Sequence, residues 1–304
     1  MIALRLLQKI IPIALSLTLT VAVTPGIATA QNAPSYSPAD LDKLVSRIAL
    51  YPDPLLAQVL AAATYPDQIP DAAQWADEHH YLRGDDLARA ITEDNLPWDP
   101  SVQALLPFPS VLEMMASDIN WTRDLGNAFL AQQQDVMDAV QRMRRQAANY
   151  GYLRSNSQVV VSTGPYITIA PANPDFIVVP VYNPAIVFAR PAPGFFVGGA
   201  INFGFGISLG VGFRPWGWGT TRFAWDRHEV FVANRHWERN WANRNAYVHH
   251  YDDIHRSNEV RRVEHHDLIH RDENERDAAR LGHERPHEVH HEEHAQHGDH
   301  DHHH

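Results

Sequence analysis

Histidine is the residue type with the clearest chemical potential in this chain, and it is concentrated at the C-terminal end. Residues 249–304 contain 16 of the 20 histidines of the 304-residue chain. Neutral imidazole binds zinc, copper and nickel, and histidines four positions apart share one face of a helix. The candidate metal ligands are His283, His287, His290, His291 and His294. The hypothesis that follows is divalent-metal binding or buffering by this histidine-rich tail.

The same tail contains the pattern H-E-x-x-H twice, at residues 283–287 and 287–291. In zinc proteases two histidines of this pattern hold the metal and the glutamate acts as base. One copy contains Pro286, and few large apolar side chains surround either copy, so a helix here has no core to pack against. Composition alone accounts for the pattern. We predict that 249–304 is a low-complexity tail, either disordered or a solvated helix.

Three aspartates form a second candidate site, for a hydrolase. Asp53 and Asp67 each follow a Tyr-Pro pair, while Asp53 and Asp99 each precede a proline. A hydrolase would require these carboxylates to converge in a pocket with displaced pKa values. The alternative is that they start helices, because an oxygen acceptor followed by proline is typical of a helix N-terminus. The sequence has no nucleophile elbow, phosphate-binding loop or calcium loop, which favours the structural interpretation.

Composition excludes further classes of protein. The chain has no cysteine, which rules out disulfides, thiolate zinc sites, a cysteine nucleophile and a lipid-modified cysteine. The formal net charge is −11, and the arginines are interspersed with carboxylates. We therefore expect no nucleic-acid partner.

Residues 1–30 have the layout of a cleavable signal peptide. Arg5 and Lys9 precede an apolar stretch at 10–23, and Ala28-Thr29-Ala30 places the cut before Gln31. The stretch of 14 residues is shorter than the roughly 20 apolar residues of a spanning helix. We expect export to the periplasm, no transmembrane helix after cleavage, and any membrane attachment to be peripheral.

Residues 31–150 are predicted to form a helical domain of six to eight short helices. Three pairs of capping residue and proline mark helix starts: Ser37-Pro38, Asp53-Pro54 and Asp99-Pro100. The last two helices are predicted at 117–130 and 132–149. Residues 151–190 change to short, β-branched, proline-bounded runs, which predict a small antiparallel β region with strands at 158–162, 166–169 and 176–181.

Residues 191–248 are rich in glycine and tryptophan, and 191–213 carry no charge. From 201 to 213, bulky apolar side chains fill the odd positions while glycine, serine or asparagine fills the even ones. This period predicts a strand with one nearly bare face, which allows close approach of another backbone or of a surface. Strands of a soluble domain are favoured, and a membrane-associating or self-associating segment and a spanning helix stay as alternatives. The tryptophans either close a small core or line a binding surface.

Two long motifs carry a family resemblance. Residues 48–66 read IALYPDPLLAQVLAAATYP, and residues 95–109 read NLPWDPSVQALLPFP. With these motifs the chain resembles the domain-of-unknown-function family numbered 3300, found in exported proteins of Gram-negative bacteria, from about residue 41 to 184. The resemblance implies no known activity and no catalytic residues, and it implies a variable low-complexity tail.

The sequence as a whole predicts an α+β exported protein. Its parts are a signal peptide at 1–30, a helical domain at 31–150, β regions at 151–190 and 191–248, and the tail at 249–304. The leading functional hypothesis is a non-enzymatic envelope protein whose partners are envelope proteins or the membrane surface. Metal buffering by the tail and a hydrolase in the helical domain are the alternatives.

Overall fold

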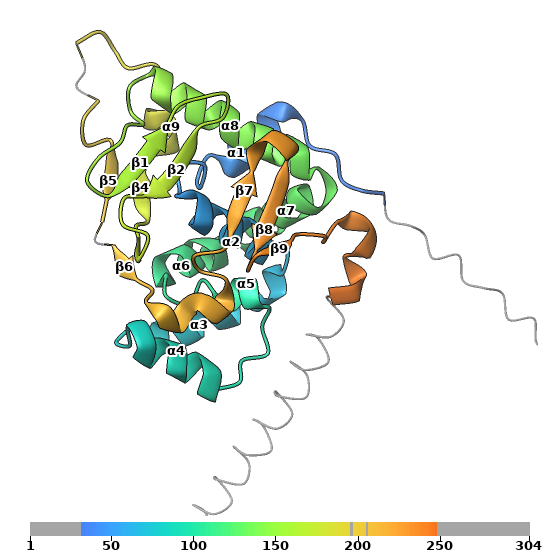
Figure 1. Cartoon of the computed structure of the whole chain (residues 1–304). Helices are drawn as coiled ribbons and strands as arrows, with labels where there is room; N and C mark the ends of the chain where they lie inside the picture. Colours follow the sequence, from blue (N-terminus) through green and yellow to red (C-terminus); the bar gives the residue numbers. More distant parts are fainter. Residues whose placement is uncertain (1–31, 195–196, 205, 248–304) are drawn as a thin grey trace, which may run out of the picture. The chain divides into compact units, whose positions relative to one another are not determined.

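The computed structural model describes residues 32–194, 197–204 and 206–247, and helices dominate its first part (Figure 1). In chain order, with η marking 3-10 helices, the elements are α1 (Pro38–Val45), α2 (Asp53–Ala63), η1 (Pro66–Gln68), α3 (Ile69–Glu78), α4 (Gly84–Glu93), α5 (Pro100–Gln103), α6 (Pro109–Ser117), α7 (Ile119–Ala131) and α8 (Gln133–Asn149). The predicted multi-helix region is confirmed. The two helices predicted at 117–130 and 132–149 are found as α7 and α8.

The predicted helix caps are correct in two of three places. Ser37 and Asp99 each accept a hydrogen bond from the first turn of the helix that follows, α1 and α5. The prediction for Asp53 is wrong, because this residue is the first of α2 and the N-cap is Pro52, which has no side-chain acceptor. The carboxylate of Asp53 is instead used in a buried ion pair described below.

Helix α2 forms the centre of the core, and residues 55–63 are all buried. α7 crosses it at Gly126, where a Cβ would lie 2.0 Å from the carbonyl oxygen of Ala63. Only glycine permits this approach of the two backbones. α2 packs against the helices α5 and α7 and against the strands β2, β7 and β8, so both helices and strands surround it (Figure 1).

Short antiparallel strands follow the helices. Their pairs are β1 (Val159–Ser162) with β2 (Thr168–Pro171), β3 (Phe176–Ile177) with β6 (Ile207–Ser208), β4 (Pro180–Tyr182) with β5 (Ile201–Phe203), and β8 (Glu229–Val232) with both β7 (Arg222–Ala224) and β9 (Arg235–His236). The remaining helical turns are α9 (Pro184–Val187), η2 (Val211–Trp216), η3 (Trp225–Arg227) and η4 (Trp241–Asn243). The α+β class with small antiparallel sheets is therefore confirmed.

The single strand expected from the alternation at 201–213 is wrong, because this segment is divided into β5, β6 and η2. Gly210 interrupts it with a φ of 58°, in the left-handed region that favours glycine. Two glycines of the segment lie close to neighbouring side chains rather than to another backbone. A Cβ at Gly212 would lie 2.7 Å from Oδ1 of Asp85 in α4, and one at Gly206 would lie 3.1 Å from Cβ of Phe176.

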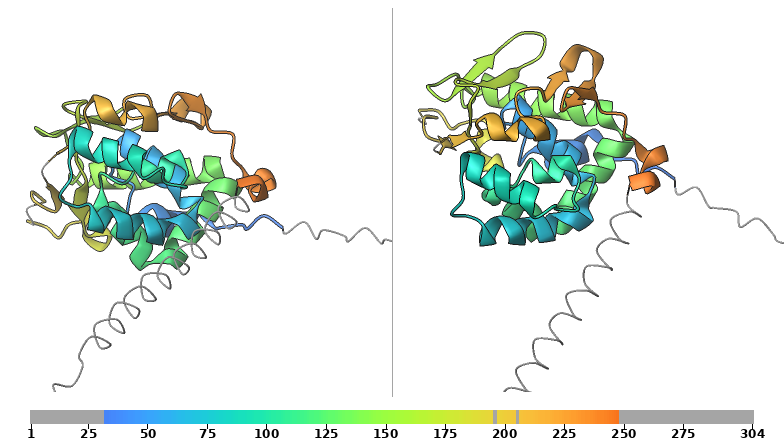
Figure 2. Two further views of the ribbon diagram at one scale, coloured as in Figure 1. Left: turned by 90° about the horizontal axis from the view of Figure 1, so that it is seen from below. Right: turned by 60° about the horizontal axis from the view of Figure 1, so that its bottom comes forward.

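The β7–β8–β9 sheet and η2 cover one side of the helices (Figure 2), and β7 and β8 contact α2. Trp216, Trp218 and Trp225 of this layer are buried. Trp216 donates a hydrogen bond to Gln103 Oε1 and Trp218 donates one to the carbonyl of Ala104. These tryptophans therefore close the core, and the β elements share that core with the helices. Within the described ranges, no helix combines the length and apolar character needed to cross a membrane.

Candidate functional site

A buried ion pair joins the first motif to α8. Arg144 has the largest fully buried side chain among the described residues, and its Nη1 lies 2.6 Å from Oδ1 of Asp53. The guanidinium also donates hydrogen bonds to the carbonyls of Ala49 (2.8 Å), Tyr51 (3.0 Å) and Ile167 (2.8 Å). All three nitrogens of this guanidinium are therefore engaged in holding the corner between α1 and α2.

Both oxygens of Asp53 are engaged as well. Oδ2 accepts a hydrogen bond from the indole of Trp225 at 3.0 Å, and Oδ1 accepts one from the N–H of Ile169 at 3.3 Å. The guanidinium carbon of Arg144 lies 5.1 Å from the Trp225 ring centroid. Buried charges persist only when they are paired and hydrogen-bonded. Asp53 therefore stabilises the packing of α2 against α8, β2 and η3.

The three aspartates of the hydrolase hypothesis lie at opposite ends of α2. Asp53 begins this helix of 11 residues, which is about 16 Å long at 1.5 Å per residue. Asp67 lies in η1 beyond its C-terminal end. Asp99 caps α5 and interacts with Tyr65 at that same end, where burial and the Asp99 carboxylate together raise the pKa of Tyr65. Asp53 is therefore remote from Asp67 and Asp99, and its carboxylate is paired with Arg144.

Candidate metal ligands were predicted only in the tail. His283, His287, His290, His291 and His294 lie outside the described residues. Among the residues that are described, no three histidine, aspartate or glutamate side chains gather as a metal site. Metal binding by the tail stays a prediction.

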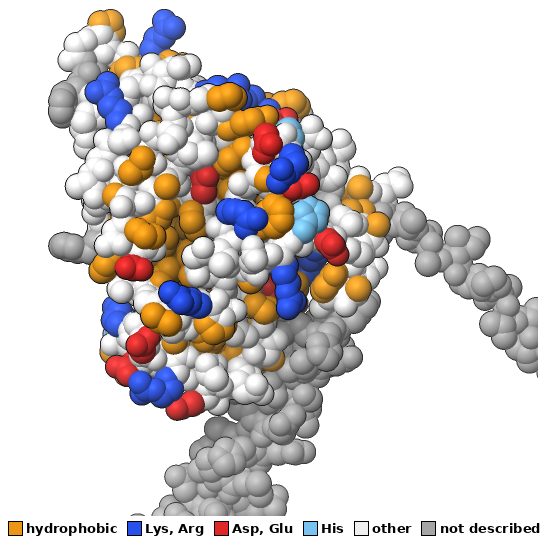
Figure 3. Space-filling model, in the orientation of Figure 1, with side chains coloured by type: hydrophobic (Ala, Val, Ile, Leu, Met, Phe, Trp, Pro, Cys, Tyr) orange, Lys and Arg blue, Asp and Glu red, His pale blue; other side chains and the backbone are white. Residues whose placement is uncertain are grey.

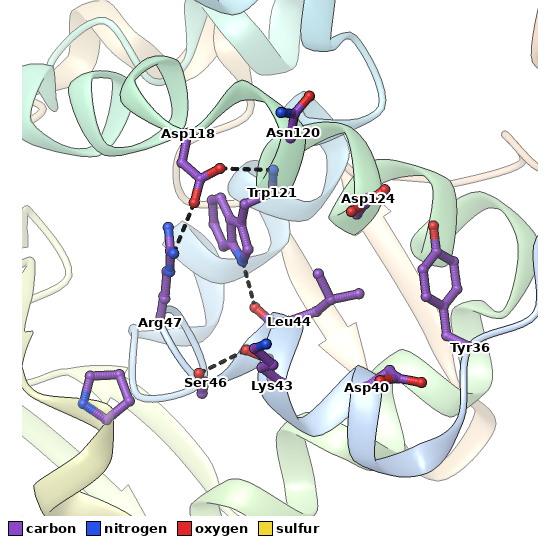
Figure 4. Close-up of a pocket in the computed structure, with 11 residues that line it drawn as sticks. Tyr36, Asp40, Lys43, Leu44, Ser46, Arg47, Asp118, Asn120, Trp121 and Asp124 are labelled. Atoms are coloured by element: carbon purple, nitrogen blue, oxygen red, sulfur yellow. Dashed lines mark hydrogen bonds and ion pairs between the residues drawn. The ribbon is translucent and has the colours of Figure 1, made fainter.

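A groove beside the first motif is the strongest candidate for a functional site. We call it the Arg47 groove, and it has two halves that share Arg47 and Pro184. The first, the acidic half, has a volume of about 640 Å³ and lies where α1 faces α7 (Figure 4). It is lined by Tyr36, Asp40, Lys43, Leu44, Ser46, Arg47, Asp118, Asn120, Trp121, Asp124 and Pro184. Three carboxylates and two cations therefore surround a partly apolar floor.

Arg47, Asp118 and Trp121 form a fixed wall of the acidic half. Asp118 accepts a hydrogen bond from the N–H of Trp121 at the start of α7 and pairs with Arg47 at 2.9 Å. The guanidinium carbon of Arg47 lies 5.1 Å from the Trp121 ring centroid, and the indole donates a hydrogen bond to the carbonyl of Leu44 at 3.0 Å. These contacts link α1 to α7 (Figure 4).

The charges of the acidic half act on its own titratable groups. The hydrogen bond from the Trp121 N–H, aided by Arg47, lowers the pKa of the Asp118 carboxyl and keeps it ionised. Burial raises the pKa of Tyr36, and the negative charge of Asp124 raises it further. Tyr36 therefore remains a neutral hydrogen-bonding group beside an exposed carboxylate at neutral pH.

The second half of the groove, the apolar half, has a volume of about 440 Å³. Its lining is Arg47, Tyr51, Ser110, Met114, Val179, Pro180, Val181, Tyr182 and Pro184. Tyr182 fixes β4 against the corner between α1 and α2, because its hydroxyl donates to the carbonyl of Ser46 at 2.9 Å and accepts from the N–H of Leu50 at 3.3 Å. Val181 points away from the core and is 66% exposed.

Sequence reasoning did not identify the residues of this groove. Arg47 is the residue immediately before the first motif, which is the signal that could have singled it out. Asp118 was not recognised as the cap of α7. Tyr36 and Asp124 are 88 positions apart in the sequence, and only the packing of the N-terminal stretch beside α7 brings them together.

A second hollow lies where the glycine-rich segment meets the helices. Figure 3 shows hydrophobic side chains gathered on the face that carries β6 and η2. The hollow there, of about 530 Å³, is lined by Pro54, Pro171, Pro174, Asp175, Phe176, Ile177, Ser208, Leu209, Gly210, Val211, Arg214, Trp218, Gly219 and Thr221. Part of the uncharged segment thus faces the surface, and its contact with a membrane stays a prediction.

Comparison with known proteins identifies the family. The family described as "Protein of unknown function (DUF3300)" matches residues 37–271, which include both motifs and nearly all of the Arg47 groove. The "Uncharacterized protein YacH" of Escherichia coli (strain K12) is 35% identical over 235 residues, covering 62% of this chain and 37% of that protein. The chain thus matches little more than a third of that relative's length. No solved structure matches the chain. This chain belongs to the DUF3300 family.

Proposed function

We propose that this protein is an exported, non-enzymatic binding module of the cell envelope, and that the Arg47 groove is its contact site for another envelope protein. The observation that carries the proposal is the groove itself. It combines an apolar half of about 440 Å³ with an acidic half of about 640 Å³. Export rests on the signal-peptide pattern of residues 1–30.

The wall of the groove supports recognition because its side chains hold one another through several contacts. Arg47 is held both by Asp118 and by the face of Trp121, and Trp121 is held by the Leu44 carbonyl. A site that is ordered before binding loses less conformational entropy when a partner arrives. The aromatic and arginine side chains on this wall are also the types enriched among residues that dominate binding energy.

A binding role is favoured over hydrolysis by the use of the motif carboxylates. Asp53 is bonded by Arg144, Trp225 and Ile169. Asp99 is bonded by the N–H and hydroxyl of Ser101. These carboxylates serve the packing of the helices, and neither lines the Arg47 groove.

Site-specific photocrosslinking in living cells tests the proposal. A benzophenone amino acid is placed at position 43 in the acidic half, at position 181 in the apolar half, or at position 160 as control. Val160 is an exposed valine of β1, in another two-stranded sheet away from the groove. We expect positions 43 and 181, but not 160, to yield the same adduct, which mass spectrometry identifies as an envelope protein.

The adduct should decrease when Arg47→Ala removes the centre of the groove. If positions 43 and 181 yield no envelope protein, or yield the same adducts as position 160, the groove is not the contact site. Export is tested separately by osmotic shock, which should release the protein with the periplasmic fraction. Recovery with the cytoplasmic fraction would contradict the envelope location.

A further inference from the structure

We infer that the partner presents an extended peptide segment which adds as a strand to the open edge of β4 and places a basic side chain beside Asp124. This inference rests on the proposed function, and it names the kind of ligand that the Arg47 groove accepts. Four observations support it: the position of the groove relative to β4, the direction of the β4 backbone groups, the apolar lining, and the charge at the far end.

The apolar half lies along the edge of β4. Four consecutive residues, 179–182, line it, whereas none of the described residues of β5 does. Side chains of a strand alternate between its two faces, so a groove lined by consecutive residues and by only one strand lies at the edge of the sheet. Within the described ranges, β4 pairs with β5 alone. The edge that borders the groove is therefore the unpaired one.

The register of β4 shows which backbone groups face this edge. Pro180 lies opposite Phe203, and Val181 lies opposite Asn202. Proline has no N–H, so the pair at Pro180 is of the non-hydrogen-bonded type, and Val181 is the residue that bonds to β5. The N–H and carbonyl of Tyr182 and the carbonyl of Pro180 then point to the open edge. An extended peptide uses such groups when it adds to a sheet.

The lining of the apolar half favours a peptide with small or branched apolar side chains. Met114 and Tyr51 form the wall opposite β4, and the Tyr51 hydroxyl is directed to the Met114 sulfur at 3.8 Å. The wall therefore offers apolar surface and an adaptable thioether. Burial of the exposed part of Val181 adds to the contact.

The acidic half determines the charge of the peptide. It carries Asp40, Asp118 and Asp124 against Lys43 and Arg47. Asp118 is already paired with Arg47, and Asp40 accepts a hydrogen bond from Ser37. Asp124 lies exposed at the end of the groove, where its charge acts on Tyr36. A basic side chain is the complement of this end, and the net charge of −11 of the chain favours approach of a basic segment.

The direction of β4 sets the order of residues in an antiparallel peptide. β4 runs from Pro180 toward Pro184, which borders both halves of the groove. A peptide that runs antiparallel therefore enters from the acidic half and ends in the apolar half. Antiparallel pairing is the more frequent arrangement in proteins, so the basic residue should precede the apolar run.

Three labelled peptides test the inference by fluorescence anisotropy with the purified protein. The probe is RGSVTVTV, the second peptide has citrulline in place of arginine, and the third has N-methyl groups at alternate residues of the VTVTV run. A reversed peptide, VTVTVSGR, tests the order. We expect the N-methylated peptide to bind more than about tenfold more weakly, because it loses its two hydrogen bonds to the carbonyls of Pro180 and Tyr182. The reversed peptide should bind more weakly than the probe.

Asp124→Asn should weaken binding of the arginine peptide by about two- to fivefold, the range of an exposed ion pair, and leave the citrulline peptide unchanged. Glu113→Gln is the matched control, because Glu113 is an exposed carboxylate of α6 that does not line the groove. Hydrogen exchange should show protection of residues 179–183 on binding, and no change at β1.

The outcomes separate the inference from the function on which it rests. Strand addition is overturned if the N-methylated peptide binds as tightly as the probe, or if the peptide protects amides from hydrogen exchange elsewhere than at residues 179–183. Equal effects of Asp124→Asn on the arginine and citrulline peptides overturn the charge assignment. If crosslinking from positions 43 and 181 still captures an envelope protein in either case, the groove remains the contact site and only the ligand is wrong.

Discussion

Replacing Asp53 by asparagine should destabilise the protein strongly, because it leaves the guanidinium of Arg144 buried without a counter-charge. Arg144 is 0% exposed, and its remaining partners are three backbone carbonyls. Removal of one partner of a buried ion pair costs about 3–5 kcal/mol. For a domain of this size that is a fall in Tm of roughly 6–20 °C.

The matched experiment is a double-mutant cycle with Asp53→Asn, Arg144→Met and the two together. Arg144→Met leaves Asp53 with its hydrogen bonds from Trp225 and Ile169, and it leaves the carbonyls at the α1–α2 corner without a donor. The double variant removes both charges, so it should be more stable than the sum of the single effects implies. Urea unfolding followed by tryptophan fluorescence measures this, since Trp225 lies against the pair.

Two results would refute the reasoning about this pair. One is a loss of less than about 1 kcal/mol for Asp53→Asn, which is the range of an exposed ion pair. The other is that the losses of unfolding free energy in the two single variants add up to the loss in the double variant, which would mean that the charges do not interact. Retained binding of the RGSVTVTV peptide by a folded Asp53→Asn protein would be expected in every case, because Asp53 does not line the groove.

Gly126→Ala should lower the free energy of unfolding by about 1–3 kcal/mol through overpacking, since its Cβ would lie 2.0 Å from the Ala63 carbonyl oxygen. Thermal unfolding measures this loss of stability. The control Gly204→Ala, which has open space around it, should be nearly neutral. Asp118→Asn should destabilise the protein slightly at pH 7, because the lowered pKa of this carboxyl contributes stability that is present above its unfolded value of about 4. The difference from the unsubstituted protein should shrink as the pH falls through the folded pKa, and an unchanged difference in acid would contradict this. Deletion of 249–304 should abolish most zinc, copper or nickel binding in calorimetry, and growth in excess or limiting metal decides whether that binding is physiological.

The helices could be predicted because their signals are local. Ser37-Pro38 and Asp99-Pro100 each place an acceptor and a proline at a helix start, and both act within one turn of chain. Asp53-Pro54 has the same local signal, yet Asp53 serves Arg144, 91 positions away. A dipeptide cannot reveal such a partner, since tertiary packing decides which acceptor the buried guanidinium uses.

The prediction of one long strand in the glycine-rich segment was wrong for a related reason. Its alternation from 201 to 213 has the period of a strand, but period alone does not say whether a partner strand of equal length exists. β3 and β4 each offer only two or three residues to it. Gly210 then turns the chain, and Gly212 lets η2 pack on α4. The alternation therefore indicated that neighbouring residues could lie close to the glycines, as they do at Gly206 and Gly212, but it was wrong about the length of the strand.

The groove could not be predicted, because all of its lining residues except Tyr51 lie outside the two motifs. The first motif nevertheless holds the groove in place. On one side, Arg144 binds the carbonyls of Ala49 and Tyr51. On the other side, Tyr182 accepts from the N–H of Leu50 and donates to the carbonyl of Ser46. Four backbone positions around Arg47, at residues 46, 49, 50 and 51, are thus held between α8 and β4. The first motif therefore shapes the groove although most of the residues that line the groove lie outside the motif.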